Sequence, residues 1–132
     1  MRELLEPHAA AQAAGNIPPA EIEHLEAMAA AARPHAHDDW TTRAQEFDFA
    51  LHLTIAKYAR NYALGEAIRK CWTFKRLSYL AVPEAPESLE MGYGEHLALL
   101  TALKAGDAVT SRAAVTFHLR SAANLRPAKT IV

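Results

Sequence analysis

The apolar residues of this chain recur at the three- and four-residue spacing of an α-helix, and each run of that pattern stops at Pro, Gly or Asn. The interruptions fall at Gly15, Asn61 and Gly106 and at the two stretches PHAHDD and PEAPES. Glycine is scarce, with 5 residues in 132, whereas alanine is abundant, and this balance favours helix over strand. The sequence therefore predicts an all-α fold, an antiparallel helical bundle of about six helices joined by short connections.

The expected helices can be placed from these interruptions. They cover about 1–14, 18–33, 40–58, 62–82, 88–105 and 108–124, with Asp107 as the cap of the last one. In the fourth helix, the apolar spacing predicts that Leu64, Ile68, Cys71 and Phe74 face the core. Residues 126–132 (RPAKTIV) are expected to form a flexible tail, which leaves one folded domain over residues 1–125.

Composition and charge exclude several classes of protein. The formal net charge is -1 and basic residues are scattered, so the chain alone is expected to bind nucleic acid poorly. No apolar run approaches the roughly 20 residues that span a bilayer, and the start does not resemble a signal peptide. The single cysteine, Cys71, precludes an internal disulfide and fits a reducing compartment. We therefore expect a cytoplasmic protein without a membrane partner.

The stretch FDFALHLTIA, residues 47–56, places two polar side chains inside a helix that otherwise belongs to a core. Phe47, Leu51 and Ile55 follow the helical spacing, and Asp48 and His52 lie among them. Residues four apart on a helix are separated by about 40° and about 6 Å, so the carboxylate and the imidazole share a face. A buried Asp–His hydrogen bond would explain this pair on its own.

Two more histidines lie at matching heights on a predicted helical hairpin. His96 lies ten residues before Gly106 and His118 twelve residues after it. In an antiparallel helix pair with a rise of about 1.5 Å per residue, these two side chains come within about 3 Å of the same level. Three imidazoles and one carboxylate suit a divalent transition metal, Zn or Ni, and leave coordination positions open. Of the other histidines, His35 and His37 are expected in a solvated loop, with a loose surface metal contact as the alternative, and His8 and His24 at the surface or in packing.

These motifs resemble the FCD domain, the C-terminal effector domain of FadR-type transcription regulators in the GntR superfamily. The resemblance rests on DFALHLTIAKYARN, on EHLALLTALKAGDAVTSRAAVTFHL and on the opening RELLEPHAAAQAA, and it covers nearly the whole chain. It implies that Asp48, His52, His96 and His118 bind a metal, as in the metal-binding branch of the family. It also implies a homodimer and a small-molecule effector.

Family members carry a winged helix-turn-helix ahead of this domain, whereas this chain starts directly at RELLEP. Two interpretations follow from that difference. Either the sequence is part of a longer regulator, or it is a stand-alone sensor that does not bind operator DNA. In both cases DNA is a partner only through a winged-helix domain outside this sequence.

A metal with one carboxylate and three neutral imidazoles keeps positive charge in a poorly solvated cavity, so a small organic acid is the expected effector. On the fourth helix Arg69 and Trp72 are expected near the height of His52, and together with Arg76 they form an i, i+3, i+7 stripe. An arginine fork is well suited to a carboxylate. Arg2 matches an arginine that recurs in the first helix of the family. We therefore expect ligand-binding roles for these four residues.

Two other functions compete with effector sensing. A metal with open positions can activate water, so a metal-dependent hydrolase or isomerase on a helical bundle is the main alternative. Such an enzyme needs a general base near the metal, and the sequence indicates neither HExxH nor a further carboxylate beside the four ligands. A purely structural helical interaction module is the third hypothesis, and it requires that the four polar residues do not converge.

Overall fold

The structure of the protein, a computed structural model, describes residues 2–125 and contains six helices and no strand within that range. The all-α fold expected from the sequence is confirmed. The expected tail, residues 126–132, lies outside the described residues. No helix in the described part of the chain has the length and hydropathy needed to cross a membrane. The helices are α1 (Arg2–Ala13), α2 (Pro19–Ala31), α3 (Trp40–Tyr58), α4 (Tyr62–Ala81), α5 (Pro86–Ala105) and α6 (Ala108–Leu125).

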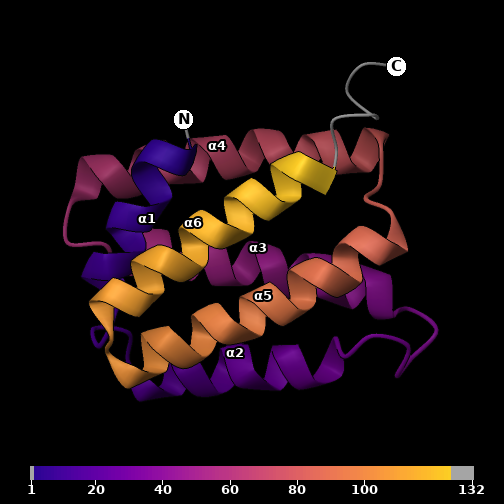
Figure 1. Ribbon diagram of the computed structural model, residues 1–132, viewed down its shortest axis with the longest axis horizontal. Helices are drawn as coiled ribbons and strands as arrows, with labels where there is room; N and C mark the ends of the chain where they lie inside the picture. The colour runs from indigo at the N-terminus through magenta and orange to yellow at the C-terminus, as the bar shows by residue number, and fades with distance from the viewer. Residues whose placement is uncertain (1, 126–132) are drawn as a thin grey trace.

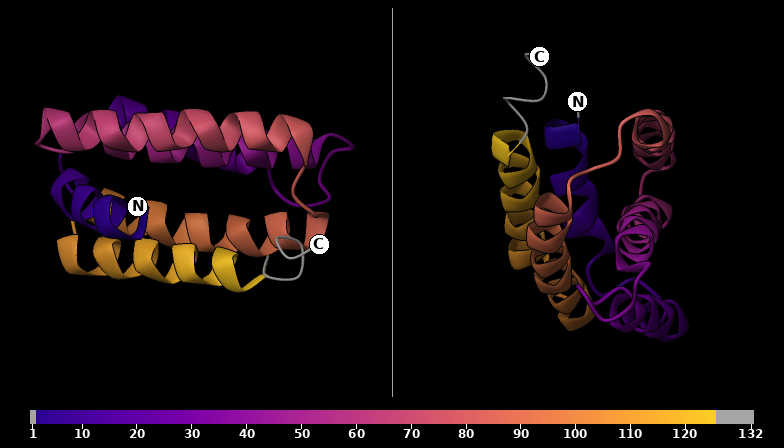
Figure 2. Two further views of the ribbon diagram at one scale, coloured as in Figure 1. Left: turned by 90° about the horizontal axis from the view of Figure 1, so that it is seen from above. Right: turned by 90° about the vertical axis from the view of Figure 1, so that its right-hand side faces the viewer.

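The helices form two layers of three (Figures 1 and 2). One layer consists of α2, α3 and α4, with α3 between the other two, and the second layer consists of α1, α5 and α6. Helix α3 packs against α1 and α5 of the opposite layer as well as against its two neighbours. The middle of α3 therefore faces the inside of the bundle, where side chains from both layers meet.

The connections form where the sequence places helix-ending residues. Asn61 caps α4 by accepting a hydrogen bond from the backbone N–H of Leu64 at 3.0 Å, and Asp107 caps α6 by accepting one from Thr110 at 2.9 Å. Gly106 ends α5 with a φ of 74°, which is the left-handed conformation that glycine adopts readily. Helix α5 begins at Pro86 and not at Ser88, because proline is favoured in a first helical turn.

Helix α4 is rotated relative to the expectation from its apolar pattern. Its buried residues are Gly65, Ile68 and Trp72, which recur at the i, i+3, i+7 spacing of one helix face. Phe74 lies two residues beyond Trp72, about 200° around the helix, and is 75% exposed. The prediction that Phe74 faces the core was therefore wrong, because the large indole of Trp72 takes the inward position.

Gly65 lets α4 approach α3 closely, and its replacement tests that packing. In Gly65→Ala the new methyl group would lie 2.6 Å from the carbonyl oxygen of Ala56, which is backbone and cannot swing away. We expect this variant to lower the free energy of unfolding by about 1–3 kcal/mol in urea denaturation. The control is Gly94→Ala on α5, where no atom lies within 4 Å of the new methyl. It should raise stability by up to about 1 kcal/mol, and equal effects of the two variants would contradict the close approach.

Candidate metal centre

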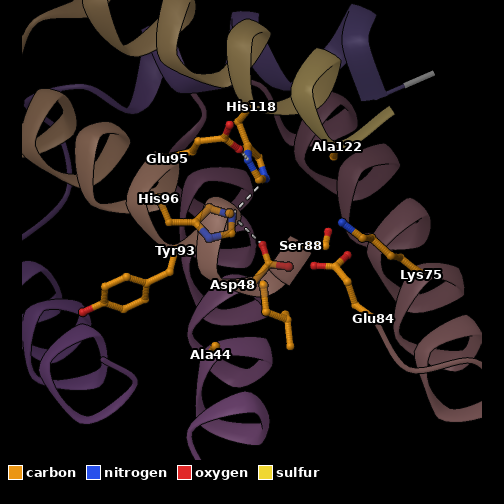
Figure 3. Close-up of a pocket in the computed structure, with 12 residues that line it drawn as sticks. Ala44, Asp48, Lys75, Glu84, Ser88, Tyr93, Glu95, His96, His118 and Ala122 are labelled. Carbon is orange, nitrogen blue, oxygen red and sulfur yellow. Dashed lines mark hydrogen bonds and ion pairs between the residues drawn. The ribbon is translucent and has the colours of Figure 1, made fainter. Parts of the chain in front are cut away.

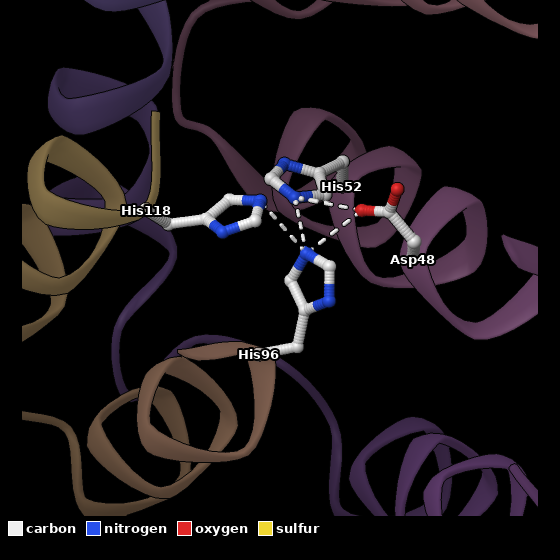
Figure 4. A group of neighbouring side chains, drawn as sticks. All are labelled: Asp48, His52, His96 and His118. Carbon is white, nitrogen blue, oxygen red and sulfur yellow. Dashed lines mark hydrogen bonds and ion pairs between the residues drawn. The ribbon is translucent and has the colours of Figure 1, made fainter. Parts of the chain in front are cut away.

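Four buried side chains from three helices meet between the two layers (Figure 4). Asp48 and His52 come from successive turns of α3, His96 from α5 and His118 from α6. One ligand atom of each lies within 4.8 Å of those of the other three. The Nε2 atom of His96 is 2.8 Å from Asp48 Oδ1, 3.0 Å from His118 Nε2 and 3.3 Å from His52 Nε2. The structure thus brings together the four residues that the sequence singled out.

Two glutamates hold the outer nitrogens of the cluster. His52 Nδ1 lies 2.6 Å from Oε1 of Glu6 on α1, and His118 Nδ1 lies 2.7 Å from Oε1 of Glu95 on α5. A carboxylate accepts hydrogen bonds, so each Nδ1 carries the proton that it donates. In the neutral imidazoles the lone pair then lies on Nε2, and both Nε2 atoms point into the cluster.

Trp72 forms a wall behind His52. Its ring stacks on the imidazole with a centroid distance of 4.4 Å and an interplanar angle of 23°. The indole N–H donates to Glu6 Oε1 at 3.1 Å, and the Arg2 guanidinium lies 4.4 Å from the centre of the Trp72 ring while its Nε donates to Glu6. The Glu6 carboxylate thus accepts hydrogen bonds from three side chains on α1, α3 and α4.

The charges of the cluster shift its pKa values in opposite directions. Burial would raise the pKa of Glu6, but His52 and Arg2 outweigh it and lower that pKa to about 2. Burial would likewise raise the pKa of Asp48, yet its interactions with His96, Lys75 and His52 hold that pKa well below its usual range. The two carboxylates therefore remain ionised in the interior of the bundle.

The three imidazoles differ among themselves. Burial lowers the pKa of His96, and it lowers the pKa of His118 to about 4. Burial acts in the same direction on His52, but the adjacent carboxylates of Glu6 and Asp48 raise its pKa overall. Glu6 and Asp48 thus favour the protonated form of His52, and cation binding, which needs a free lone pair on the imidazole, would oppose that protonation.

The donor set fits a divalent transition metal. Asp48 Oδ1 is buried and makes no hydrogen bond of good geometry with any described residue, although two imidazole nitrogens lie close to it. Two ligands about 2.1 Å from one ion lie roughly 3.0 Å apart at a right angle and roughly 3.4 Å apart at the tetrahedral angle. Four of the six separations between the ligand atoms, 2.8 to 3.3 Å, are close to that spacing, and all six are within 4.8 Å. A cation shared by the four residues would accept the lone pairs of the imidazole nitrogens and of Asp48 Oδ1, which otherwise face one another.

One side of the cluster opens into a cavity (Figure 3). Asp48, His96 and His118 line it, whereas His52 lies behind them against Trp72. Facing them are Lys75 of α4, Glu84 of the connection before α5, and Ser88 of α5. A ligand that reached the cluster through this cavity would meet these three side chains.

None of the four residues expected to bind the ligand lines the cavity: two lie behind the cluster and two lie away from it. Trp72 and Arg2 lie behind the cluster, as described above. The described residues that line the cavity do not include Arg69 or Arg76. The Arg69 side chain is 64% exposed beside Glu66, and the Arg76 guanidinium lies 4.6 Å from the centre of the Phe49 ring. Helix geometry explains this placement, because Arg69 and Arg76 lie about 60° and 40° to one side of Trp72 around α4. Lys75, which lines the cavity, lies about 60° to the other side.

Sequence reasoning missed the carboxylates next to the cluster. The expectation that no further carboxylate lies beside the four ligands was wrong, since Glu6 and Glu95 each contact one of the histidines. A signal for Glu6 exists in the sequence: it shares an i, i+4, i+7 face with Ala10 and Ala13, both fully buried. Both carboxylates accept hydrogen bonds from imidazoles, so they orient the ligands. The remaining histidines are exposed, namely His8, His24, His35 and His37.

The comparison with known families agrees with this architecture. The model of the FCD domain matches residues 1–121. The chain belongs to the FCD domain family. This domain is the C-terminal, effector-binding and dimerisation domain of GntR-type transcription regulators. No curated protein and no solved structure matches the chain.

The lowered pKa of His118 predicts how acid affects the metal-free FCD domain. Because that pKa is about 4 in the folded state and about 6.5 when unfolded, the unfolded state binds more protons between these values. The stability that the neutral His118 contributes is present above pH 6.5 and is lost as the pH falls toward 4. In chelator-treated protein the thermal midpoint of His118→Gln should therefore fall less over this range than that of the wild type. Parallel curves would contradict the shift, and His24→Gln, at an exposed histidine, is the control.

Proposed function

We propose that this FCD domain senses a small organic acid through a divalent transition metal, Zn or Ni, held by Asp48, His52, His96 and His118. The observation that carries the proposal is the convergence of four buried ligand atoms with one side open to a cavity. Family membership supports it, since domains of this type bind effectors and dimerise in transcription regulators.

Each part of the site has a role in this proposal. The bound ion supplies positive charge and open coordination positions for a carboxylate oxygen. Glu6 and Glu95 orient His52 and His118 so that their Nε2 atoms face the ion. Trp72 closes the rear of the site, so the effector approaches from the cavity side. Binding then requires no covalent chemistry.

We also propose that the domain acts as a homodimer and controls DNA through a winged-helix domain in the same regulator. An effector that binds one arrangement of the dimer more tightly shifts the population toward it, and with it the spacing of the DNA-binding domains. Exposed apolar side chains on α4, Phe74, Leu77 and Leu80, support self-association. Sedimentation velocity at micromolar concentration that shows monomer alone would contradict the dimer.

The hydrolase or isomerase alternative receives less support from the site. A general base must reach a metal-bound water. Glu6 and Glu95 are engaged with His52 and His118, and Glu84 across the cavity accepts a hydrogen bond from Tyr79. The family match also supports ligand binding, since the domain serves regulators. A turnover assay of the metal-loaded protein with a panel of carboxylic acids distinguishes sensing from catalysis.

Metal binding is testable by removing ligands one at a time. We expect about one Zn or Ni per chain in protein purified without an affinity tag, measured by elemental analysis. His52→Ala or His96→Ala should weaken metal affinity by at least about tenfold and remove the stabilisation that metal gives the folded state. His24→Ala, at an exposed histidine, is the matched control. Full occupancy in both single variants and in the double variant would refute the site.

Effector binding should depend on the metal. Small carboxylic acids should raise the thermal midpoint of the metal-loaded domain and leave that of the chelator-stripped domain unchanged, because only the loaded site offers positive charge. Differential scanning fluorimetry at increasing acid concentration measures this shift. The same shift with and without metal would mean that the acid binds elsewhere and that the metal is structural.

A further inference from the structure

The cavity next to the metal centre carries charges of both signs on the wall that faces the cluster. Lys75 provides an ammonium group, Glu84 a carboxylate and Ser88 a hydroxyl (Figure 3). A pocket made only to hold additional carboxylates of an effector would present cations on that wall. The presence of Glu84 thus restricts which acids fit.

Aromatic side chains hold both charged groups in place. The ammonium of Lys75 lies 4.3 Å from the centre of the Trp72 ring and 5.3 Å from that of Tyr79. The Tyr79 hydroxyl donates a hydrogen bond to Glu84 Oε1 at 2.9 Å. Lys75 and Glu84 are therefore fixed relative to Trp72, which also stacks against the ligand His52.

The cavity is too small for an organic acid unless side chains that line it move. The free space inside the cavity is about 20 Å³, which is room for roughly one water molecule. An organic acid whose carboxylate reaches the metal centre through this cavity therefore has to displace lining side chains or replace their contacts, and Lys75 and Glu84 lie on the wall that faces the cluster. The part of the acid beyond its carboxylate would then contact both the ammonium of Lys75 and the carboxylate of Glu84.

We propose that the effector is a hydroxy acid with a single carboxylate, whose hydroxyl groups contact Lys75, Glu84 and Ser88, and that Glu84 selects against a second carboxylate. The proposal rests on the function proposed above, since the first carboxylate is taken to bind at the metal. A hydroxyl group can donate a hydrogen bond to Glu84 and accept one from Lys75, so it is compatible with both side chains. A second carboxylate in the same place would lie against the carboxylate of Glu84.

The test uses pairs of acids that differ only at one end. Glycerate and hydroxymalonate have the same three carbons, with a CH2OH group in the first where the second has a carboxylate, and threonate and tartrate form the corresponding four-carbon pair. Calorimetric titration of the metal-loaded protein gives the affinity ratio within each pair. Because a metal can itself prefer the dicarboxylate, the decisive quantity is the change of this ratio between wild type and Glu84→Gln.

We expect Glu84→Gln to shift the ratio toward the dicarboxylate by roughly tenfold in at least one pair. Tyr79→Phe, which removes the hydrogen bond to Glu84, should shift it in the same direction by less. Glu87→Gln, at an exposed glutamate on the first turn of α5, is the control and should leave the ratio unchanged. Metal content measured on each variant shows that the centre is intact.

The outcomes separate this inference from the proposed function. If both acids of a pair bind but Glu84→Gln leaves their ratio unchanged, Glu84 selectivity is refuted and effector sensing stands. If neither acid binds the loaded protein, both are refuted. Serine differs from glycerate by an ammonium in place of the 2-hydroxyl, and tighter binding of serine would replace the hydroxy-acid assignment. A larger loss of glycerate binding in Arg69→Ala than in Lys75→Met would refute the placement of the ligand in this cavity.

Discussion

The buried carboxylate of Glu6 is the constraint on which the interior of this domain depends. An ionised group out of contact with water must be paired, and Glu6 accepts hydrogen bonds from Arg2, His52 and Trp72. These partners fix α1 against α3 and α4, across the boundary between the two layers. The orientation of His52 follows from this arrangement, because its Nδ1 is held by Glu6 and its ring by Trp72.

A second carboxylate repeats this arrangement on the other side of the cluster. Glu95 on α5 holds His118 on α6, so two glutamates from different helices orient two imidazoles toward one point. Contacts outside the four ligands thus orient His52 and His118, and these contacts would hold both imidazoles in position for a bound cation. This organisation is why the proposed metal site and the packing of the bundle cannot be varied independently.

The extent to which the sequence predicted this site follows from the geometry involved. Whether His96 and His118 lie at the same height along the α5–α6 hairpin depends only on the helix rise and on the position of Gly106. Counting residues from Gly106 was therefore enough to predict that they lie close together. The face of α4 was not predictable in this way, because its apolar residues allow two rotations. The choice between them depends on Trp72 packing against His52, a contact between residues distant in sequence. The burial of Glu6 was not predicted, because a buried carboxylate needs hydrogen-bond donors, and two of its donors, His52 and Trp72, belong to helices distant in sequence.

The position of the cluster between the layers suggests how a local ligand could have a distant effect. Asp48 and His52 belong to the layer of α3, and His96 and His118 to the layer of α5 and α6. A ligand that changes the coordination of the proposed metal therefore acts on both layers at once. Through Glu6 the same change reaches α1, the helix nearest in sequence to where regulators of this family carry their DNA-binding domain. Packed helices shift as units and do not deform continuously, so a small displacement at the centre favours one arrangement of whole helices over another.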